Sequence, residues 1–424
     1  MKTADAVAIF VGIILGSGVF VAPAQVIAAA PSIGGALAIW ALGAIVAACG
    51  AFTYAELGAR FPQNGGFYVY YQAVFGSAPA FIGGWSALLV TYPASTAAIA
   101  LLGASYIKAI VPAAGPYVPW VATAALVLAG ALNWAGVRSG ATAQRVLTAF
   151  KVVAVLAVCL AALFASGSPT RGATTMPVSS LAFVLTAVVS VLWSYDGWSD
   201  VTLVTGELVA PERNLGRAVA VGVLVLFAVY SLVQLAVMSL LPLSVAAGSS
   251  SVLADAVQAS LGAKASGLIA AIVVVSTFGS VNGIMLTSSR LAQAMSRDRV
   301  IPSWFAGDLG TPKRAIAAMV LATTAYVWLS DFRGLLEFFG QTIWLFYGLT
   351  ACGLVRLRWR GDVVNAFRAP VGAPYVVIAV ALAMTIGLAI ADVRRFFTGV
   401  VFVGSAAPTY LLWRYVMKRV PPSS

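Results

Sequence analysis

Two short glycine-containing stretches have residue types whose backbone could bind a small charged ligand. The first is Gly16-Ser17-Gly18, near the middle of the apolar run closest to the N-terminus. Glycine weakens a helix, and an interruption here would leave unpaired N–H groups at the start of the second half-helix. Such amides, at the positive end of a helix dipole, suit a carboxylate. Close helix packing is the alternative explanation, and the spacing of Gly12 and Gly16 is typical of it.

The second stretch surrounds an acidic residue inside another apolar run. It reads Trp193-Ser194-Tyr195-Asp196-Gly197, and a carboxylate at membrane depth is costly unless it faces a partner or a water-filled cavity. Gly197 permits unwinding there, and two broken helices in corresponding positions favour a discontinuous binding site over simple packing. Carbonyls freed near Ile14 and Trp193 would accept an ammonium group. The two stretches together predict a site for a zwitterion, such as an α-amino acid.

Lys151 lies ten residues into the fifth apolar run, about 15 Å along a helix. It could extend its ammonium group to the membrane surface, or lie in the helix bundle as a fixed or titratable cation. Because burial disfavours the charged form of lysine, a role in proton coupling is chemically available. Glu56, Glu207 and Arg290 fall near the ends of apolar runs, where we expect ordinary solvated or ion-paired surface residues.

The composition indicates that these residues are held by membrane-spanning helices. Of 424 residues, 61% are hydrophobic and 9% charged, whereas soluble domains carry about a quarter charged residues. Apolar runs long enough to cross the bilayer recur along the whole chain. We therefore predict a single all-α membrane domain, with the N-terminal run as its first span rather than a signal peptide. The twelve spans are predicted at about 5–29, 35–58, 80–109, 117–136, 142–166, 180–206, 214–241, 264–295, 314–330, 335–356, 371–391 and 395–416.

The distribution of basic residues predicts the orientation. If both termini are cytoplasmic, 19 of the 25 Lys and Arg residues lie on the cytoplasmic side, as the positive-inside rule requires. The net charge of +12 therefore reflects topology, and no nucleic-acid partner is expected. The six basic residues left outside are Lys108, Arg171, Lys264, Arg333, Arg394 and Arg395.

The remaining polar residues argue against an enzyme. The chain has no His, and its three cysteines, Cys49, Cys159 and Cys352, lie inside apolar runs, where we expect small buried hydrophobes. No metal site and no cofactor are predicted. A membrane-embedded enzyme would need paired carboxylates or a nucleophile with its base, and a channel would need a pore loop or a charged ring. None of these patterns is visible.

Five motifs in chain order resemble the L-amino-acid transporter family of the amino acid–polyamine–organocation superfamily. They extend from the first span to the eighth, and Phe367-Arg368-Ala369-Pro370 adds a further match. The motifs are Gly16-Ser17-Gly18-Val19-Phe20, Tyr54-Ala55-Glu56-Leu57-Gly58 with Gly65-Gly66, Tyr195-Asp196-Gly197-Trp198, Val204-Thr205-Gly206-Glu207 with Pro211-Glu212-Arg213-Asn214-Leu215, and Phe278-Gly279-Ser280-Val281-Asn282-Gly283 with Thr287-Ser288-Ser289-Arg290-Leu291.

The resemblance implies a fold, an activity and a set of site residues. It implies a LeuT-like 5+5 inverted repeat, over about 5–166 and 180–356, with extra helices over about 371–416. It also implies sodium-independent transport of amino acids, often by exchange. The amides of Gly16, Ser17 and Gly18 would bind the substrate carboxylate, and Lys151 would occupy the space of a sodium ion. The carbonyls of Ile14 and Trp193 would accept the amine, with the Trp193 ring as the gate.

Departures from the family pattern qualify this picture. Gly206 replaces a glutamate, which puts a cytoplasmic ion pair in doubt, and Trp193 replaces the commoner Phe. The loop after the third span lacks the cysteine that bonds a heavy chain in animal members, so no disulfide-linked partner is expected. Asp196 occurs in some relatives that accept cationic substrates.

We therefore predict an exchanger of neutral L-amino acids, with two alternatives. The first is a proton-coupled importer, and the second is a carrier that also accepts cationic amino acids through Asp196. The substrate and the lipid bilayer are the expected partners. Asp196 and Gly197 are also expected among the substrate-binding residues. The expected cavity walls are Thr91, Ser95, Trp193, Asp196, Trp344 and Tyr347.

Overall fold

The computed structural model describes residues 1–16, 18–165, 180–249, 251–262, 265–307, 311–330, 332–361 and 366–417. Within these ranges the chain is helical and contains no strand, which confirms the all-α class. The α-helices are α1 (Thr3–Ile14), α2 (Gly18–Ala29), α3 (Ile33–Arg60), α4 (Phe67–Phe75), α5 (Ser77–Ser86), α6 (Tyr92–Ile110), α7 (Val118–Trp134), α8 (Val137–Ala165), α9 (Leu181–Ser194), α10 (Pro211–Leu240), α11 (Leu243–Gly248), α12 (Val252–Leu261), α13 (Ala265–Arg297), α14 (Lys313–Leu329), α15 (Phe332–Trp359), α16 (Ala373–Ala391) and α17 (Val393–Met417).

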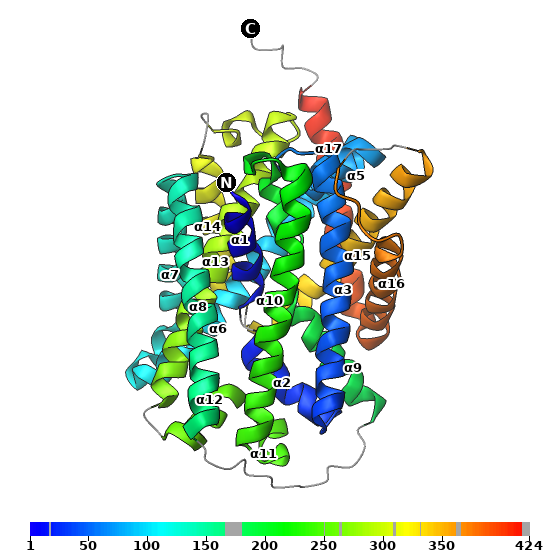
Figure 1. Ribbon diagram of the computed structural model, residues 1–424. Helices are drawn as coiled ribbons and strands as arrows, with labels where there is room; N and C mark the ends of the chain where they lie inside the picture. Colours follow the sequence, from blue (N-terminus) through cyan, green and yellow to red (C-terminus); the bar gives the residue numbers. More distant parts are fainter. Residues whose placement is uncertain are drawn as a thin grey trace.

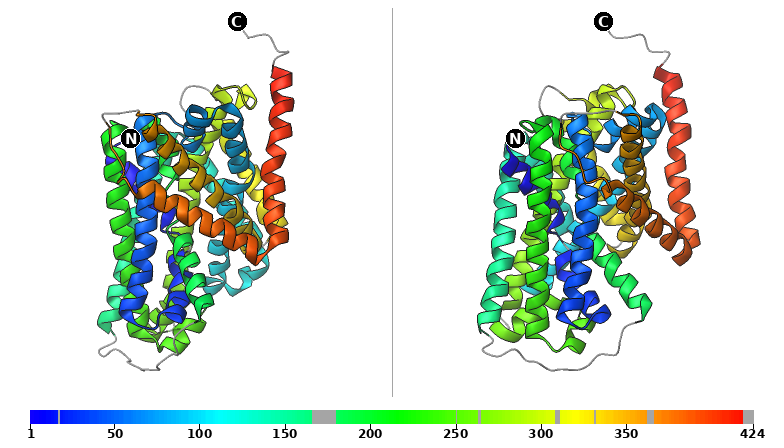
Figure 2. Two further views of the ribbon diagram at one scale, coloured as in Figure 1. Left: turned by 90° about the vertical axis from the view of Figure 1, so that its right-hand side faces the viewer. Right: turned by 45° about the vertical axis from the view of Figure 1, so that its right-hand side comes forward.

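The long helices stand side by side in one bundle (Figure 1). Within it, α10 packs along α3 and α1, and α13 packs along α6 and α8. In the first span, α1 packs against α10, α8 and α13, and α2 packs against α9 and α11. The interruption between α1 and α2 lies near the middle of the bundle (Figure 1). The helices α16 and α17 pack against α15 on the outside of the bundle (Figure 2).

The N-terminus and the last turns of α17 lie at the same end of the bundle in every view (Figures 1 and 2). We call this end the N-terminal face. A chain whose two ends lie on one side of a membrane crosses it an even number of times. The arrangement therefore agrees with an even number of spans.

Eight helical segments of the described chain are long and apolar enough to cross a bilayer, and the bent pair α1–α2 brings the number to nine. The other predicted spans coincide with α9, α14 and α15. Of these, α9 has 14 residues and α14 has 17, fewer than the roughly 20 that cross a bilayer without tilt or extension. The count of twelve and the inverted repeat remain predictions.

The third predicted span is a composite of several helical segments. α5 and α6 are joined by the π-helical turn Ala87–Thr91, and α4 precedes them as a separate helix after Gly66. The π-turn places Thr91 and Tyr92 beside the interruption of the first span, because both residues line the cavity described below. Insertions of this kind are frequent at functional sites.

The cysteines are less uniformly buried than expected. Cys159 is buried in α8, Cys49 is half-buried in α3, and Cys352 is exposed on α15. The expectation of a small buried hydrophobe is therefore wrong for Cys352, which lies on the outer surface of its helix.

Candidate functional site

The first span is broken where its glycines predict. α1 ends at Ile14 and α2 begins at Gly18, and the two helix axes differ by 56°. The Gly16 amide donates to the Ile14 carbonyl at 2.7 Å, so it does not continue the helical pattern. As the first residue of α2, Gly18 has an amide without a helical acceptor, which the expected carboxylate site requires. Ser17 lies outside the described residues.

The second break follows α9. This helix ends at Ser194, and after an irregular turn the chain continues as the 3₁₀ segment Asp200–Glu207. The Asp196 amide donates to the Trp193 carbonyl at 3.1 Å. Gly197 has a φ of +105°, a backbone conformation that side chains with a Cβ rarely adopt. A glycine beside the aspartate therefore allows the chain to turn here.

The two breaks contact each other directly. A Cβ added to Gly18 would lie 2.6 Å from the Cα of Ser194. A Cβ added to Gly197 would lie 2.8 Å from the Cγ2 of Ile13. Because both distances are far below van der Waals contact, only glycine allows the two interrupted spans to approach this closely.

A tyrosine that the sequence analysis did not single out connects the two breaks. The Tyr230 hydroxyl on α10 has one hydrogen to donate, and two carbonyls lie within its reach, that of Ser194 at 2.6 Å and that of Ile14 at 3.2 Å. Its ring packs between Trp40 and Tyr195. Nothing in the local sequence distinguishes this tyrosine from a core residue, so only the fold reveals it.

The expected acceptors of a substrate amine are therefore already engaged in this conformation. The Ile14 carbonyl accepts from the Gly16 amide and the Tyr230 hydroxyl, and the Trp193 carbonyl accepts from the Asp196 amide. A carbonyl oxygen has two lone pairs. An ammonium group at Ile14 would thus have to replace the Tyr230 bond.

A small cavity lies between the two breaks, α6, α13 and α15. Its volume of about 40 Å³ is small, since roughly 10–15 Å³ holds a single water. An amino acid can therefore enter only if the surrounding helices move apart. The lining residues include the predicted Ile14, Gly16, Gly18, Thr91, Ser95, Trp193, Asp196, Gly197 and Tyr347.

Trp344 is the one predicted wall residue that does not line this cavity. Its ring instead packs edge-on against Tyr347, with the centroids 5.6 Å apart. Tyr347 also packs against Trp198, with centroids 4.0 Å apart. Trp344 therefore supports the cavity wall from behind.

The cavity contains two carboxylates, whereas the sequence analysis considered only one. Tyr347 donates to Asp196 at 2.8 Å, and Tyr92 donates to Asp200 at 3.3 Å. None of the ion pairs found in the described chain involves either aspartate. Both line the cavity, and their spacing of four residues was the signal that the sequence offered. The structure thus brings together paired carboxylates that the sequence analysis did not find.

Lys151 lies in the bundle and does not reach toward the membrane surface. Its side chain is fully buried on α8. The ammonium group donates to the carbonyls of Gly12 at 2.7 Å, Leu15 at 2.8 Å and Ser276 at 2.8 Å, with the Ser280 hydroxyl at 3.3 Å. It therefore binds carbonyls at the C-terminal end of α1, where a cation is favoured by the helix dipole.

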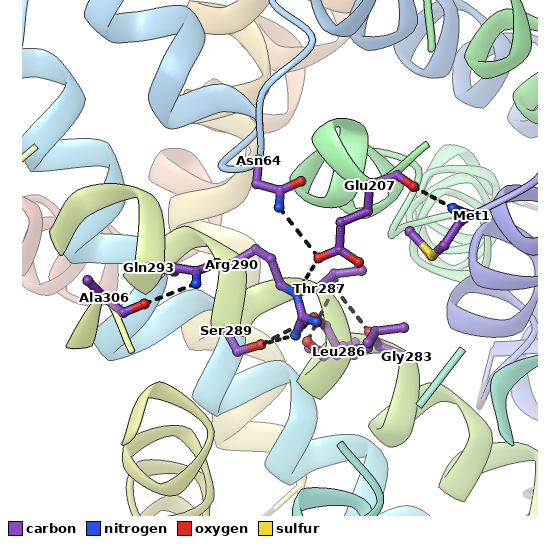
Figure 3. A network of polar contacts seen from close by, with 11 residues as sticks. Met1, Asn64, Glu207, Gly283, Leu286, Thr287, Ser289, Arg290, Gln293 and Ala306 are labelled. Atoms are coloured by element: carbon purple, nitrogen blue, oxygen red, sulfur yellow. Dashed lines mark hydrogen bonds and ion pairs between the residues drawn. The ribbon is translucent and has the colours of Figure 1, made fainter. Parts of the chain in front are cut away.

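A buried polar network lies near the N-terminal face (Figure 3). Arg290 on α13 pairs with Glu207 at 2.9 Å, and Asn64 also donates to Glu207. Arg290 is ion-paired, as one of the two expected forms has it, but its side chain is fully buried, so the expected surface location is wrong. Gly206 does not prevent this ion pair, because the neighbouring glutamate makes it.

Glu56 is likewise buried rather than solvated. Its carboxylate pairs with Arg60 at 2.7 Å and with Arg358, and it accepts from the Ala369 amide at 2.8 Å. These bonds fasten α3 to the end of α15 and to the segment before α16. Glu56 is therefore a structural tie between distant parts of the chain.

Known proteins resemble the chain over nearly its whole length. Residues 1–417 match the Amino acid permease family. The b(0,+)-type amino acid transporter 1 of Mus musculus is 31% identical, over 96% of this chain and 86% of its own length. The large neutral amino acids transporter small subunit 2 of Homo sapiens is 33% identical, over 84% of this chain and 69% of its own length. The chain therefore belongs to the amino acid permease family, with L-amino-acid transporters as its relatives.

Proposed function

We propose that the protein is a sodium-independent transporter that exchanges neutral L-amino acids by alternating access. The observation that carries this proposal is the contact of two broken helices beside one small cavity. Such broken helices supply unpaired backbone groups at membrane depth, where side-chain charges would be costly. The relatives named as amino acid transporters support the substrate class.

In the proposed complex, the substrate carboxylate binds at the first break, and its amine binds carbonyls of both breaks. The carboxylate binds the amides of Gly16, Ser17 and Gly18 at the start of α2, where the helix dipole is positive. The amine binds the carbonyls of Ile14 and Trp193 and displaces the Tyr230 hydroxyl and neighbouring donors. The Trp193 ring then covers the bound substrate.

Lys151 supports the proposed independence from sodium. Three carbonyls and a hydroxyl surround its ammonium group, all at hydrogen-bond distance. Oxygen-only surroundings of this kind also suit a hard metal cation. A covalently attached ammonium group fills the position permanently, so no dissolved ion has to bind before the substrate.

The protein is proposed to lie in the plasma membrane with both termini in the cytoplasm, as the excess of Lys and Arg in the predicted inner loops requires. It is also proposed to act without a disulfide-linked heavy chain, although one relative is named as a small subunit. All three cysteines, Cys49, Cys159 and Cys352, lie within helices α3, α8 and α15.

A second candidate follows from the acidic pair. Two carboxylates in a closed cavity are unfavourable together unless a proton or a cation joins them. Asp196 and Asp200 could therefore take the charged side chain of a cationic amino acid, or a proton that moves with a neutral one. Either event would neutralise one of the two charges.

Uptake into proteoliposomes distinguishes these candidates. We expect labelled L-alanine to enter only when unlabelled amino acid is enclosed, without sodium and regardless of a pH gradient. Entry into empty vesicles driven by acid outside would instead support proton coupling. Competition by lysine that disappears in Asp196→Asn, with alanine uptake retained, would support the cationic alternative.

A further inference from the structure

Three buried polar side chains on α8 face α1, the first half of the broken first span. Gln144, Thr148 and Lys151 follow at spacings of four and three residues, which places them on one side of α8. Lys151 has a place in the proposed function as a fixed cation. Gln144 and Thr148 have none so far, although both are almost completely buried.

The contacts between α1 and α8 keep a constant register. Arg145 pairs with Asp5 at 3.0 Å, and the Thr148 hydroxyl donates to the Ala8 carbonyl at 2.8 Å. Lys151 continues the series at Gly12. The two helices therefore run parallel from the N-terminal face to the break. The Arg145–Asp5 pair is partly exposed and contributes little. Of the contacts between α1 and α8 described here, the Thr148 bond is therefore the buried one farthest from the break.

Gly12 allows α1 to lie this close to α8. A Cβ at this position would be 2.1 Å from the Thr148 hydroxyl oxygen and 2.2 Å from the Gln144 amide nitrogen. The first half-helix therefore fits its groove only with glycine at position 12. A larger residue would push α1 away from α8.

Gln144 is fixed by its neighbours, yet one of its groups lacks a partner. Asn282 donates to its amide oxygen at 2.8 Å, and Asn133 in turn donates to Asn282 at 3.0 Å. The Gln144 amide nitrogen has no hydrogen-bond partner among the described residues and lies against Gly12. Closure of α1 onto α8 thus buries the Gln144 amide nitrogen without a partner, which is unfavourable. Opening would expose this nitrogen to water.

We propose that Thr148 is a positioning residue that holds α1, the half of the first span next to the N-terminal face, against α8. We call the bond from Thr148 to Ala8 the latch. This bond must then break before the binding site opens to that face. If α1 tilts about Leu15 by about 20°, Ala8 moves by about 3–4 Å, because it lies about 10 Å along the helix. Lys151 keeps its bond to the Leu15 carbonyl during this motion, because Leu15 is the pivot. The inference rests on the proposed alternating access.

Thiol labelling from the N-terminal face tests the latch. The cavity residue Ile284 is replaced by cysteine after Cys49, Cys159 and Cys352 are replaced by alanine. A membrane-impermeant maleimide is then applied to vesicles of known orientation. Thr148→Val should raise the labelling rate about five-fold, which corresponds to a hydrogen bond of about 1 kcal/mol.

Two control variants define the comparison. Thr148→Ser keeps the hydroxyl and with it the hydrogen bond to Ala8. Its labelling rate should therefore stay within about two-fold of the rate of the parent protein. Thr409→Val removes a hydroxyl that donates to the Ser405 carbonyl within α17, at the outside of the bundle, and should leave labelling unchanged. Equal labelling of Thr148→Val and Thr409→Val would overturn the proposal.

A second variant tests the same motion if Thr148→Val does not fold. Gly12→Ala inserts a methyl group between α1 and α8, so it should raise labelling from the N-terminal face. Labelling at the parent rate would contradict the latch. Because the labelling requires no substrate, this result is separate from a failure of amino acid exchange in proteoliposomes.

Discussion

At the residue scale, Lys151 shows how a buried charge can stabilise a broken helix. Removing an ammonium group from water is costly unless polar partners replace its hydration. Here the carbonyls of Gly12, Leu15 and Ser276 do so, and those of Gly12 and Leu15 lie at the end of α1. One side chain thus satisfies both the cation and the carbonyls that the break releases.

Lys151→Ala is predicted to reduce transport by at least ten-fold while the protein still folds. The change removes the ammonium donor of the Gly12 and Leu15 carbonyls and leaves each with a single serine hydroxyl, so α1 is held less firmly beside the cavity. Initial rates of alanine uptake, together with size-exclusion profiles, measure the effect. The matched control is Lys108→Ala, an exposed lysine in the last turn of α6, which should transport normally. Full uptake by Lys151→Ala would contradict the assigned role.

Single residues were predictable where their chemistry is unusual for a membrane span. Lys151 and Asp196 stood out because a charge at this depth needs a reason. Tyr230 did not, because a tyrosine in an apolar run is compatible with simple packing. The surface location predicted for Arg290 and Glu56 is wrong, because their burial depends on segments far away in the sequence, which local patterns do not reveal.

At the element scale, the site depends on how closely the two interrupted spans approach. Gly18 packs on Ser194, and Gly197 packs on Ile13. Both breaks were predictable from glycine and aspartate in apolar runs. The 3₁₀ form of the segment Asp200–Glu207 was not, because it depends on packing against α13 and α1.

Gly18→Val is predicted to abolish substrate binding. Its Cβ would lie 2.6 Å from a backbone atom of Ser194, so α2 would have to move away from the second break. Binding of labelled alanine to purified protein measures the loss. Gly404→Val is the control, since no other helix of the described chain comes within 4 Å of the Cβ position on α17. Wild-type affinity in Gly18→Val would exclude the proposed binding of the substrate carboxylate by the backbone amides of Gly16–Gly18.

At the scale of the whole molecule, polar ties connect helices that are distant in sequence. Glu56 links α3 to Arg358 at the end of α15 and to the backbone of Ala369. The composition and the basic residues predicted the membrane class and an even number of spans. The packing order of the helices could not be predicted, since it depends on the shapes of their faces.

Glu56→Gln is predicted to lower thermal stability by several degrees. It removes a charge that two arginines share, and breaking a buried ion pair typically costs about 3–5 kcal/mol. The unfolding temperature of the purified protein in detergent measures this. Arg368→Gln, at an exposed neighbouring position, is the control and should change little. An unchanged unfolding temperature in Glu56→Gln would show that the tie is dispensable.

The central claim is that the two broken spans together bind a zwitterion. Competition against uptake of labelled L-alanine tests it most directly, with L-alanine, propionate and ethylamine as competitors at equal concentration. Only L-alanine is expected to compete, because it alone brings both a carboxylate to Gly16–Gly18 and an amine to the carbonyls of Ile14 and Trp193. Competition by propionate or ethylamine as strong as that by L-alanine would contradict it.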